Sequence, residues 1–291
     1  MRTIPESELI INNDGSVFHL HLKPEEISDR IILVGDPGRV EMVAKYFDSI
    51  EYEIENREFR TITGYYKNKR ISVLSTGIGT DNIDIVVTEL DALVNVDFQT
   101  RVVKNVKKSL FMVRLGTSGA LHDDIPLGSG IISVMSIGLD GLLNFYEEGQ
   151  GVSDCAAEGI FMEHMKWNPL FATPYFVRSS EFLNSLFQEE FLRGITVSAP
   201  GFYGPQGRVV RLGLAEKKFN RHLAEFSYEN MRIMNYEMES SALAGLAAML
   251  GHHATTICTV IAQRAAKQTQ TDYRPFIENI ISHTIDKLVS F

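Results

Sequence analysis

The chain contains 291 residues, of which 28 are lysine or arginine and 37 are aspartate or glutamate, so its formal net charge at pH 7 is −9. Hydrophobic residues make up 44% and charged residues 22% of the chain, a balance typical of a folded globular protein and not of a disordered one. Because proteins bind duplex DNA mainly through cationic side chains, an acidic chain without a basic run is a poor candidate for a nucleic-acid-binding protein.

Cysteine usage and the apolar runs limit the chemistry and the compartment. Cys155 and Cys258 lie far apart in the sequence, which excludes a disulfide framework and argues against a thiolate zinc site or a redox pair. We expect both to be small, buried, apolar residues. The N-terminal stretch has charges where a secretion signal needs an apolar core, and the longest apolar run, 242–250, is too short to span a bilayer. The sequence therefore predicts a cytoplasmic protein that does not bind a membrane.

In chain order, short apolar runs of the β type alternate with helical patterns. The first strand is predicted at 31–35 and the first helix at 39–47, and two alternating runs at 59–66 and 69–76 predict a hairpin. A long helix follows at about 82–95. The later elements are predicted strands at 110–115, 131–135, 195–199, 232–236 and 253–262 and helices at 238–250 and 274–291. This alternation, with no linker between its parts, predicts an α/β fold around a buried, largely parallel sheet.

Three glycine-rich loops follow predicted strands, at 35–39 (GDPGR), 75–80 (STGIGT) and 116–119 (GTSG). Ligands of such sheets bind beyond the carboxyl ends of the strands, and glycines let backbone N–H groups approach an anion closely. None of the loops fits the nucleotide P-loop or the dinucleotide fingerprint. Taken singly, each loop is more typical of an ordinary turn from strand to helix.

Arg114 interrupts an apolar strand that should be buried on both faces. A buried guanidinium keeps its charge, so it must meet either a carboxylate or a bound anion, and the sequence leaves both alternatives open. Arg39 is a second arginine beside a strand end. Together with Thr117, the two arginines would suit an oxyanion the size of phosphate.

Two later segments combine residue types that suit a ring-shaped ligand. The segment 199–208 carries two aromatic residues with Gln206 and Arg208, which could stack on a planar heterocycle and form hydrogen bonds with it; a packed surface loop is the alternative. The segment 235–240 (NYEMES) places two glutamates at a predicted helix start. Helix capping would explain them, and so would a carboxylate that binds sugar hydroxyls with Met238 packed under the ring.

These motifs, in this order, resemble those of the nucleoside phosphorylase-I family, and within it the uridine phosphorylase branch. The resemblance covers nearly the whole chain, and its most specific part is the pair FY-x-x-Q-x-R and NYEMES. The stretches that carry it are VFHL (17–20), GDPGR (35–39), NREF (56–59), STGIG (75–79), RLGTSGA (114–120), FYGPQGR (202–208), NYEMES (235–240) and VIAQR (260–264).

The resemblance implies a single domain over residues 1–291. Its fold would be a three-layer α/β sandwich with a distorted, mostly parallel mixed sheet flanked by helices. Residues 1–28 would form an N-terminal arm that contributes to the site and to a subunit interface. The family implies a homo-oligomer, either a dimer or a hexamer of dimers, with sites shared across the interface.

The resemblance also implies roles for individual residues. The residues of the phosphate site would be Gly35, Arg39, Arg114 and Thr117, with Arg57 lent by the neighbouring subunit. Those of the ribose site would be Thr117, Glu237, Met238 and Glu239, with His19 reaching the sugar from the adjacent subunit. Those of the base site would be Phe202, Gln206, Arg208 and Arg264. The expected catalytic residues are Arg114, Glu239, Gln206 and Arg208.

The activity implied is reversible phosphorolysis of uridine to uracil and ribose 1-phosphate in pyrimidine salvage, with deoxyuridine left open as a second substrate. Inorganic phosphate is then a co-substrate, and we expect no organic cofactor. We expect no metal either, because His19 and His21 share a predicted strand face without a carboxylate cluster to complete a site. The predicted partners are the nucleoside, phosphate and further copies of the chain.

Two alternatives stay open. One is a purine or broad-specificity nucleoside phosphorylase, although the purine branch usually has an aspartate after its late strand and 258–264 has none. The other is a non-catalytic nucleoside-sensing module. The chain departs from many relatives at 80–83, where TDNI stands in place of Gly-Gly-Pro-Ser, at Gly38, where an acidic residue is usual, and in a longer connection at 97–108.

Overall fold

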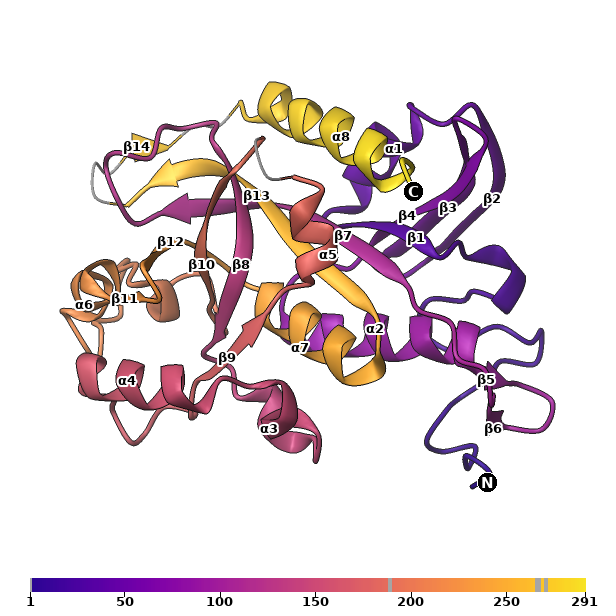
Figure 1. Ribbon diagram of the computed structural model, residues 1–291, viewed down its shortest axis with the longest axis horizontal. Helices are drawn as coiled ribbons and strands as arrows, with labels where there is room; N and C mark the ends of the chain where they lie inside the picture. Colours follow the sequence, from indigo (N-terminus) through magenta and orange to yellow (C-terminus); the bar gives the residue numbers. More distant parts are fainter. Residues whose placement is uncertain (1, 188–189, 265–267, 270–271) are drawn as a thin grey trace.

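The computed structural model describes residues 2–187, 190–264, 268–269 and 272–291, and within them twelve strands join in one sheet (Figure 1). The strands of this sheet are β1 (Arg30–Val34), β2 (Ser49–Asn56), β3 (Phe59–Tyr66), β4 (Lys69–Ser75), β7 (Phe111–Ala120), β8 (Gly130–Gly138), β9 (Tyr175–Arg178), β10 (Leu192–Ser198), β11 (Ser227–Tyr228), β12 (Met231–Glu237), β13 (His253–Gln263) and β14 (Gln268–Thr269). A separate hairpin consists of β5 (Val96–Asp97) and β6 (Val102–Val103).

The helices alternate with these strands along most of the chain. The α-helices are α1 (Pro37–Ala44), α2 (Thr80–Asn95), α3 (Gly149–Val152), α4 (Cys155–Met165), α5 (Glu181–Ser185), α6 (Phe219–Glu225), α7 (Ser240–Leu250) and α8 (Arg274–Leu288). Short 3-10 helices occur at η1 (Pro24–Glu26), η2 (Leu142–Phe145) and η3 (Gly204–Gln206).

The centre of the sheet contains the parallel strand pairs. Strands β4, β1, β7 and β13 lie side by side in parallel, and β10 pairs in parallel with β8 and β12. Antiparallel pairs join β2 to β3, β3 to β4, β13 to β8, and each of β9, β11 and β14 to its neighbour. The sheet is therefore mixed, as expected, and its parallel character is confined to these central groups.

The sheet is also curved upon itself. Strand β12 pairs with the end of β7 in addition to β10, so that β7, β13, β8, β10 and β12 close into a ring. Register shifts within β10 and β13 accompany this closure. The expected distortion of the sheet is thus a closed barrel-like region with an open extension through β1, β4, β3 and β2.

Helices cover the sheet on both faces, which gives the three expected layers (Figure 1). Ile31 and Leu33 of β1 face a core shared with α2 and α7. Ile32 and Val34 face the opposite core, shared with α1, α5 and α8. Successive side chains of a strand point to opposite faces, so a run apolar at every position is what a strand buried on both faces requires.

Most predicted elements are present with shifted ends. The predicted hairpin forms β3 and β4, and the helix predicted at 238–250 begins at Ser240. The strand predicted at 110–115, however, does not end at the glycine-rich stretch 116–119 but continues as β7 to Ala120. The prediction of a turn there is wrong, because β13 pairs with β7 throughout that stretch.

The N-terminal arm packs on its own chain before it reaches β1. Thr3 bridges to Val102 of the β5–β6 hairpin, and Arg101 Nε donates to the Ile4 carbonyl oxygen at 2.8 Å. The connection at 97–108 therefore holds the start of the arm.

One of the two cysteines does not match the prediction. Cys258 is buried in β13 as expected, whereas Cys155 is exposed, so the expectation for Cys155 is wrong. Cys155 occupies the first position of α4, and the buried residues of that helix lie at other positions along it. Within the described residues, no helix is both long and apolar enough to cross a bilayer.

Candidate active site

A cavity of about 910 Å³ opens where the loops after β1 and β4 meet β7, the end of β13 and the turn between β12 and α7. This position, beyond the carboxyl ends of β1 and β12, is where the sheet topology predicts a ligand site. Its lining includes most of the expected site residues, namely Gly35, Arg39, Arg114, Thr117, Phe202, Gln206, Arg208, Glu237, Met238 and Glu239.

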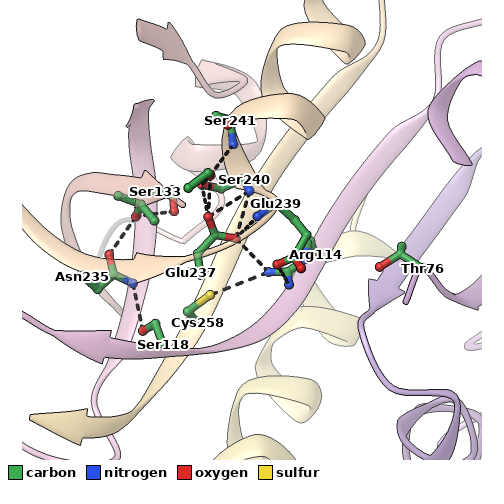
Figure 2. A network of polar contacts seen from close by, with 12 residues as sticks. Thr76, Arg114, Ser118, Ser133, Asn235, Glu237, Glu239, Ser240, Ser241 and Cys258 are labelled. Atoms are coloured by element: carbon green, nitrogen blue, oxygen red, sulfur yellow. Dashed lines mark hydrogen bonds and ion pairs between the residues drawn. The ribbon is translucent and has the colours of Figure 1, made fainter. Parts of the chain in front are cut away.

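Arg114 lies in the middle of β7 and is only 4% exposed. Its Nη1 lies 3.2 Å from Glu237 Oε2, and its Nη2 contacts Glu239 Oε2 (Figure 2). Burial lowers the pKa of Arg114, but the two carboxylates outweigh burial and the pKa is raised. The buried ion pair, one of the two alternatives that the sequence leaves open, is therefore present, and the residue also lines the cavity.

The sequence makes room for this guanidinium at Gly116, two residues further along the same face of β7. A Cβ atom at position 116 would lie 2.5 Å from Arg114 Nη1 and 2.9 Å from Cys258 Sγ. The arginine side chain therefore occupies the space that a side chain at position 116 would fill. Cys258 packs against it from β13, with Sγ 3.9 Å from Nη1, and burial raises the pKa of this thiol to about 12.

Arg39 approaches the same end of the cavity from the first turn of α1. That helix begins with Pro37, and the Asp36 side chain accepts a hydrogen bond from Gly38 N at 2.9 Å. Burial, and then the charge of Arg114, lower the pKa of Arg39. Its Nε is buried without a hydrogen-bond partner among the described residues. Arg39 is thus a partly buried cation that needs an anionic partner.

The turn between β12 and α7 places two buried carboxylates beside the arginines. Glu239 Oε1 accepts a hydrogen bond from Gly79 N at 2.7 Å, and the carboxylate also contacts Arg114. Burial, opposed by Arg114 and reinforced by Glu237, raises the pKa of Glu239. Two buried carboxylates share one guanidinium here, so part of the negative charge is left uncompensated.

Glu237 has a different environment from Glu239 (Figure 2). Its carboxylate accepts hydrogen bonds from Ser198 Oγ at 2.6 Å, from Ser240 Oγ at 2.8 Å, and from the backbone N–H groups of Glu239 and Ser240 at 2.9 Å. This carboxylate therefore caps the start of α7 and ties it to β10. Capping, one of the two interpretations of NYEMES from the sequence, is thus present at Glu237, while Glu239 lines the cavity beside Arg114.

The opposite end of the cavity contains a compact arrangement of Phe202, Gln206 and Arg208. The Arg208 guanidinium carbon lies 3.7 Å from the centre of the Phe202 ring. Arg208 Nη1 donates to Gln206 Oε1 at 2.6 Å and to the Phe202 carbonyl oxygen at 2.5 Å. Burial, and then the nearby Arg264, lower the pKa of Arg208 to about 10. An amide and a cation thus face the cavity beside an aromatic ring.

Three expected site residues do not line the cavity of their own chain. Arg264 lies behind it, where its Nη2 contacts the Gln206 carbonyl oxygen. His19 and Arg57 lie together elsewhere on the surface: the Arg57 guanidinium carbon is 5.3 Å from the centre of the Phe18 ring, which also packs edge-on against His19. Glu89 on α2 holds His19 through its Nδ1 at 2.6 Å.

Sequence reasoning did not single out several residues that line the cavity. Tyr236 belongs to the NYEMES motif, and its place directly before Glu237 is a signal that could have identified it. Ile78 follows β4 inside a loop that was noted for its glycines. Tyr273 comes from the first turn region of α8, and nothing in the local sequence pattern points to it. The described residues contain no group of three His, Cys, Asp or Glu side chains that could hold a metal ion.

Several known proteins are similar to this chain in sequence. A model of the phosphorylase superfamily matches residues 29–288. The chain is 29% identical over 255 residues to the uridine phosphorylase of Thermococcus kodakarensis, covering 88% of this chain and 80% of that protein. It is 30% identical over 259 residues to the uridine phosphorylase of Salmonella typhimurium, covering 87% and 88% respectively.

A solved structure agrees with these sequence matches. The crystal structure of a Trypanosoma brucei nucleoside phosphorylase that shows uridine phosphorylase activity superposes on this chain with a TM-score of 0.88 at 28% identity. The superposition covers 97% of this chain and the whole of that one. The likeness therefore extends over the sheet, the helices and the loops that form the cavity.

Proposed function

The chain belongs to the phosphorylase superfamily, and from this premise we propose that it is a uridine phosphorylase, a pentosyltransferase that cleaves uridine reversibly to uracil and ribose 1-phosphate. The observation that carries the proposal is Arg39. It is a cation with a lowered pKa and an unpartnered buried Nε, and it lines the same cavity as Arg114 and the two carboxylates. A bound phosphate would be the anionic partner that the Arg39 guanidinium lacks.

In this proposal, one end of the cavity binds phosphate. Gly35, Arg39, Arg114 and Thr117 surround the place where a phosphate dianion would lie. A phosphate oxygen forms a bond to C1′ of the sugar while the bond from C1′ to N1 of uracil breaks. The sugar becomes positively charged on the way, and the negative phosphate stabilises this charge. The arginines contribute mainly by binding the phosphate, neutralising part of its charge and aiming it at C1′.

The sugar would lie between phosphate and base, above Met238. Glu239 would accept a hydrogen bond from a ribose hydroxyl, and its contact with Arg114 would link the sugar to the phosphate. Glu237 is a positioning residue, because its carboxylate is already occupied by three donors at the start of α7, by Ser198 of β10 and by Arg114. The proposal therefore assigns direct ribose contact to Glu239 and an anchoring role to Glu237.

The base would lie against Phe202, with its edge towards Gln206 and Arg208. Uracil leaves C1′ carrying negative charge, which the Arg208 cation and the Gln206 amide would stabilise. Arg264 would act from behind by holding the Gln206 backbone. His19 and Arg57 would serve the site of a neighbouring subunit, since neither lines its own cavity. No metal or organic cofactor takes part in this scheme.

The test is the release of uracil from uridine with and without inorganic phosphate, with inosine as a parallel substrate. Cleavage of uridine that requires phosphate, without cleavage of inosine, is the expected result. Cleavage of inosine would move the assignment to the purine or broad-specificity alternative. Cleavage of uridine without phosphate would contradict the phosphate site. Absence of turnover on both substrates would favour the nucleoside-sensing alternative.

A further inference from the structure

Asn220, on α6, does not line the cavity, but it contacts the segment 202–208, here called the base segment. Its Nδ2 donates a hydrogen bond to the Gln206 carbonyl oxygen at 3.2 Å. The same amide lies against Gly207, where an added Cβ would be 2.4 Å from Asn220 Nδ2 and 2.8 Å from its Cγ. Gly207 has a positive φ of 71°, so the turn after Gln206 requires glycine for its backbone and also leaves the space that Asn220 fills.

A second contact determines which way the Asn220 amide faces. Tyr236 Oη donates to Asn220 Oδ1 at 3.0 Å, so the oxygen is directed to Tyr236 and the nitrogen to Gln206. Tyr236 is 1% exposed, and burial raises its pKa, which keeps the hydroxyl protonated and able to donate. Because an amide rotated by 180° would place an N–H opposite this hydroxyl and an oxygen opposite a carbonyl, the observed orientation satisfies both ends.

The Gln206 carbonyl oxygen is therefore held by two donors, Asn220 Nδ2 and Arg264 Nη2. A carbonyl oxygen has two lone pairs, so both are used. On the other side of the residue, the Gln206 amide oxygen accepts from Arg208. With backbone and side chain both held, Gln206 is 3% exposed and presents one orientation of its amide to the cavity.

We propose that Asn220 is a positioning residue for base recognition. Through the two hydrogen bonds that connect Tyr236, Asn220 and Gln206, Asn220 fixes the base segment relative to β12. This strand leads into Glu237 and Glu239. Asn220 would thereby set the distance between the group that recognises the base and the carboxylate that binds the sugar. This inference rests on the proposed uridine phosphorylase activity and adds to it a residue that does not line the cavity.

The test compares Asn220→Ala and Asn220→Asp with the wild type. Aspartate keeps the shape of the side chain but replaces the donor with an oxygen that faces the Gln206 carbonyl. We expect the KM for uridine to rise about 10-fold in Asn220→Ala and further in Asn220→Asp, because one hydrogen bond is lost in the first and a repulsion is added in the second. The KM for phosphate should stay unchanged. Arg221→Ala is the matched control, because Arg221 is the next residue of α6 and, among the residues that the structure describes, pairs with the exposed Glu225.

A second variant, Tyr236→Phe, keeps the buried ring and removes only the hydroxyl that orients Asn220. It should raise the KM for uridine about 3-fold in the wild-type background and have no further effect in the Asn220→Ala background, because residues acting in series are not additive. Additive effects would show that Tyr236 acts independently of Asn220 and would overturn the proposed chain.

The outcomes separate this inference from the activity on which it rests. A wild-type protein that cleaves uridine normally, with Asn220 variants whose KM values for uridine and phosphate are unchanged or rise together, would overturn the positioning role alone. A lower melting temperature with unchanged KM values would likewise mean a purely structural role. A wild-type protein without phosphate-dependent cleavage of uridine would overturn the proposed function, and this inference with it.

Discussion

At the scale of single residues, Arg39 and Arg114 show how two arginines of one cavity can differ in chemistry. Arg114 contacts two carboxylates and its pKa is raised, whereas Arg39 forms no ion pair within the described chain and its pKa is lowered. A cation that carboxylates already compensate attracts a further anion less strongly than an uncompensated one does. Arg39 should therefore dominate the affinity for phosphate.

Replacing Arg39 by methionine should lower kcat/KM for phosphate about 10- to 100-fold, the effect expected for losing charge-assisted hydrogen bonds. The same change should leave the melting temperature unchanged or raise it, because the folded state disfavours this charge, as the lowered pKa indicates. Steady-state kinetics and thermal melting test the two effects together. Arg232→Ala, which removes an exposed ion pair with Asp124, is the control. Equal losses of stability and activity in Arg39→Met would contradict a ligand-binding role.

Gly116 sets the position of Arg114, and a methyl group should displace it. In Gly116→Ala, the new Cβ would overlap Arg114 Nη1 and press on Cys258 Sγ. Because small misplacements of a catalytic group are costly, we expect kcat/KM to fall about 100-fold. Adding Cys258→Ala to this variant should restore part of the lost kcat/KM, because it removes the sulfur atom beside the new methyl group. Gly159→Ala in α4, where nothing lies within 4 Å of the new atom, is the matched control. Normal kinetics in Gly116→Ala would mean that the guanidinium can move without loss.

At the scale of secondary-structure elements, the alternation of β and helical patterns predicted most strands of the sheet and the helices α1, α2, α7 and α8, but it did not predict β2, β9, α4 or α5. The sequence could not show that β7 continues through 116–119, because a glycine-rich stretch reads as a turn until its partner strands are known. Pairing with β13 on one side and β12 on the other keeps this stretch extended. Likewise, Asn220 and Tyr273 reach the site region only through long-range packing, which local sequence patterns do not encode.

The turn between β12 and α7 carries the groups that should govern pH dependence. Glu239 has a raised pKa, so it takes up a proton at a pH above the ordinary value of 4.5. Protonation removes the charge that pairs with Arg114, and we expect activity to fall as pH decreases through this raised pKa. Stability should change in the opposite direction. In the window above 4.5 the folded state binds more protons than the unfolded state, so the free energy of unfolding decreases as pH rises.

The measurement is a pair of pH profiles, kcat/KM and melting temperature, for the wild type and Glu239→Gln. Glutamine resembles the protonated glutamate, so the difference in stability between the two proteins should be smallest at the acidic end and grow as pH rises through the window. If the wild type gains stability relative to Glu239→Gln as pH rises there, the pKa of Glu239 is lowered and the argument from two carboxylates sharing one arginine is wrong.

At the scale of the whole molecule, His19 and Arg57 lie together on the surface, and neither lines the cavity of its own chain. Arg57 is held by Phe18, and His19 by Glu89, so both are fixed in position without a role in their own cavity. The resemblance to the nucleoside phosphorylase-I family implies that both residues contribute to the site of a neighbouring subunit. Such residues, which do not line their own cavity, are what a shared site in a symmetric oligomer requires, since each interface then completes two sites.

Mixing two inactive variants tests this arrangement. His19→Ala and Arg114→Ala should each have little activity as pure proteins. In a dimer that shares its sites, one site of the mixed pair carries both substitutions and the other carries neither. Random reassembly of equal amounts puts about half of the chains in mixed pairs, so about one quarter of the wild-type activity should return. Reassembly after mild denaturation, with activity measured against the mixing ratio, gives the result.

Mixing His19→Ala with Arg57→Ala is the control: both residues come from the same surface region, so the mixed pair has no intact site. Absence of recovery in the first mixture would place complete sites within single chains. Recovery in the control would instead show that His19 and Arg57 do not serve the same site.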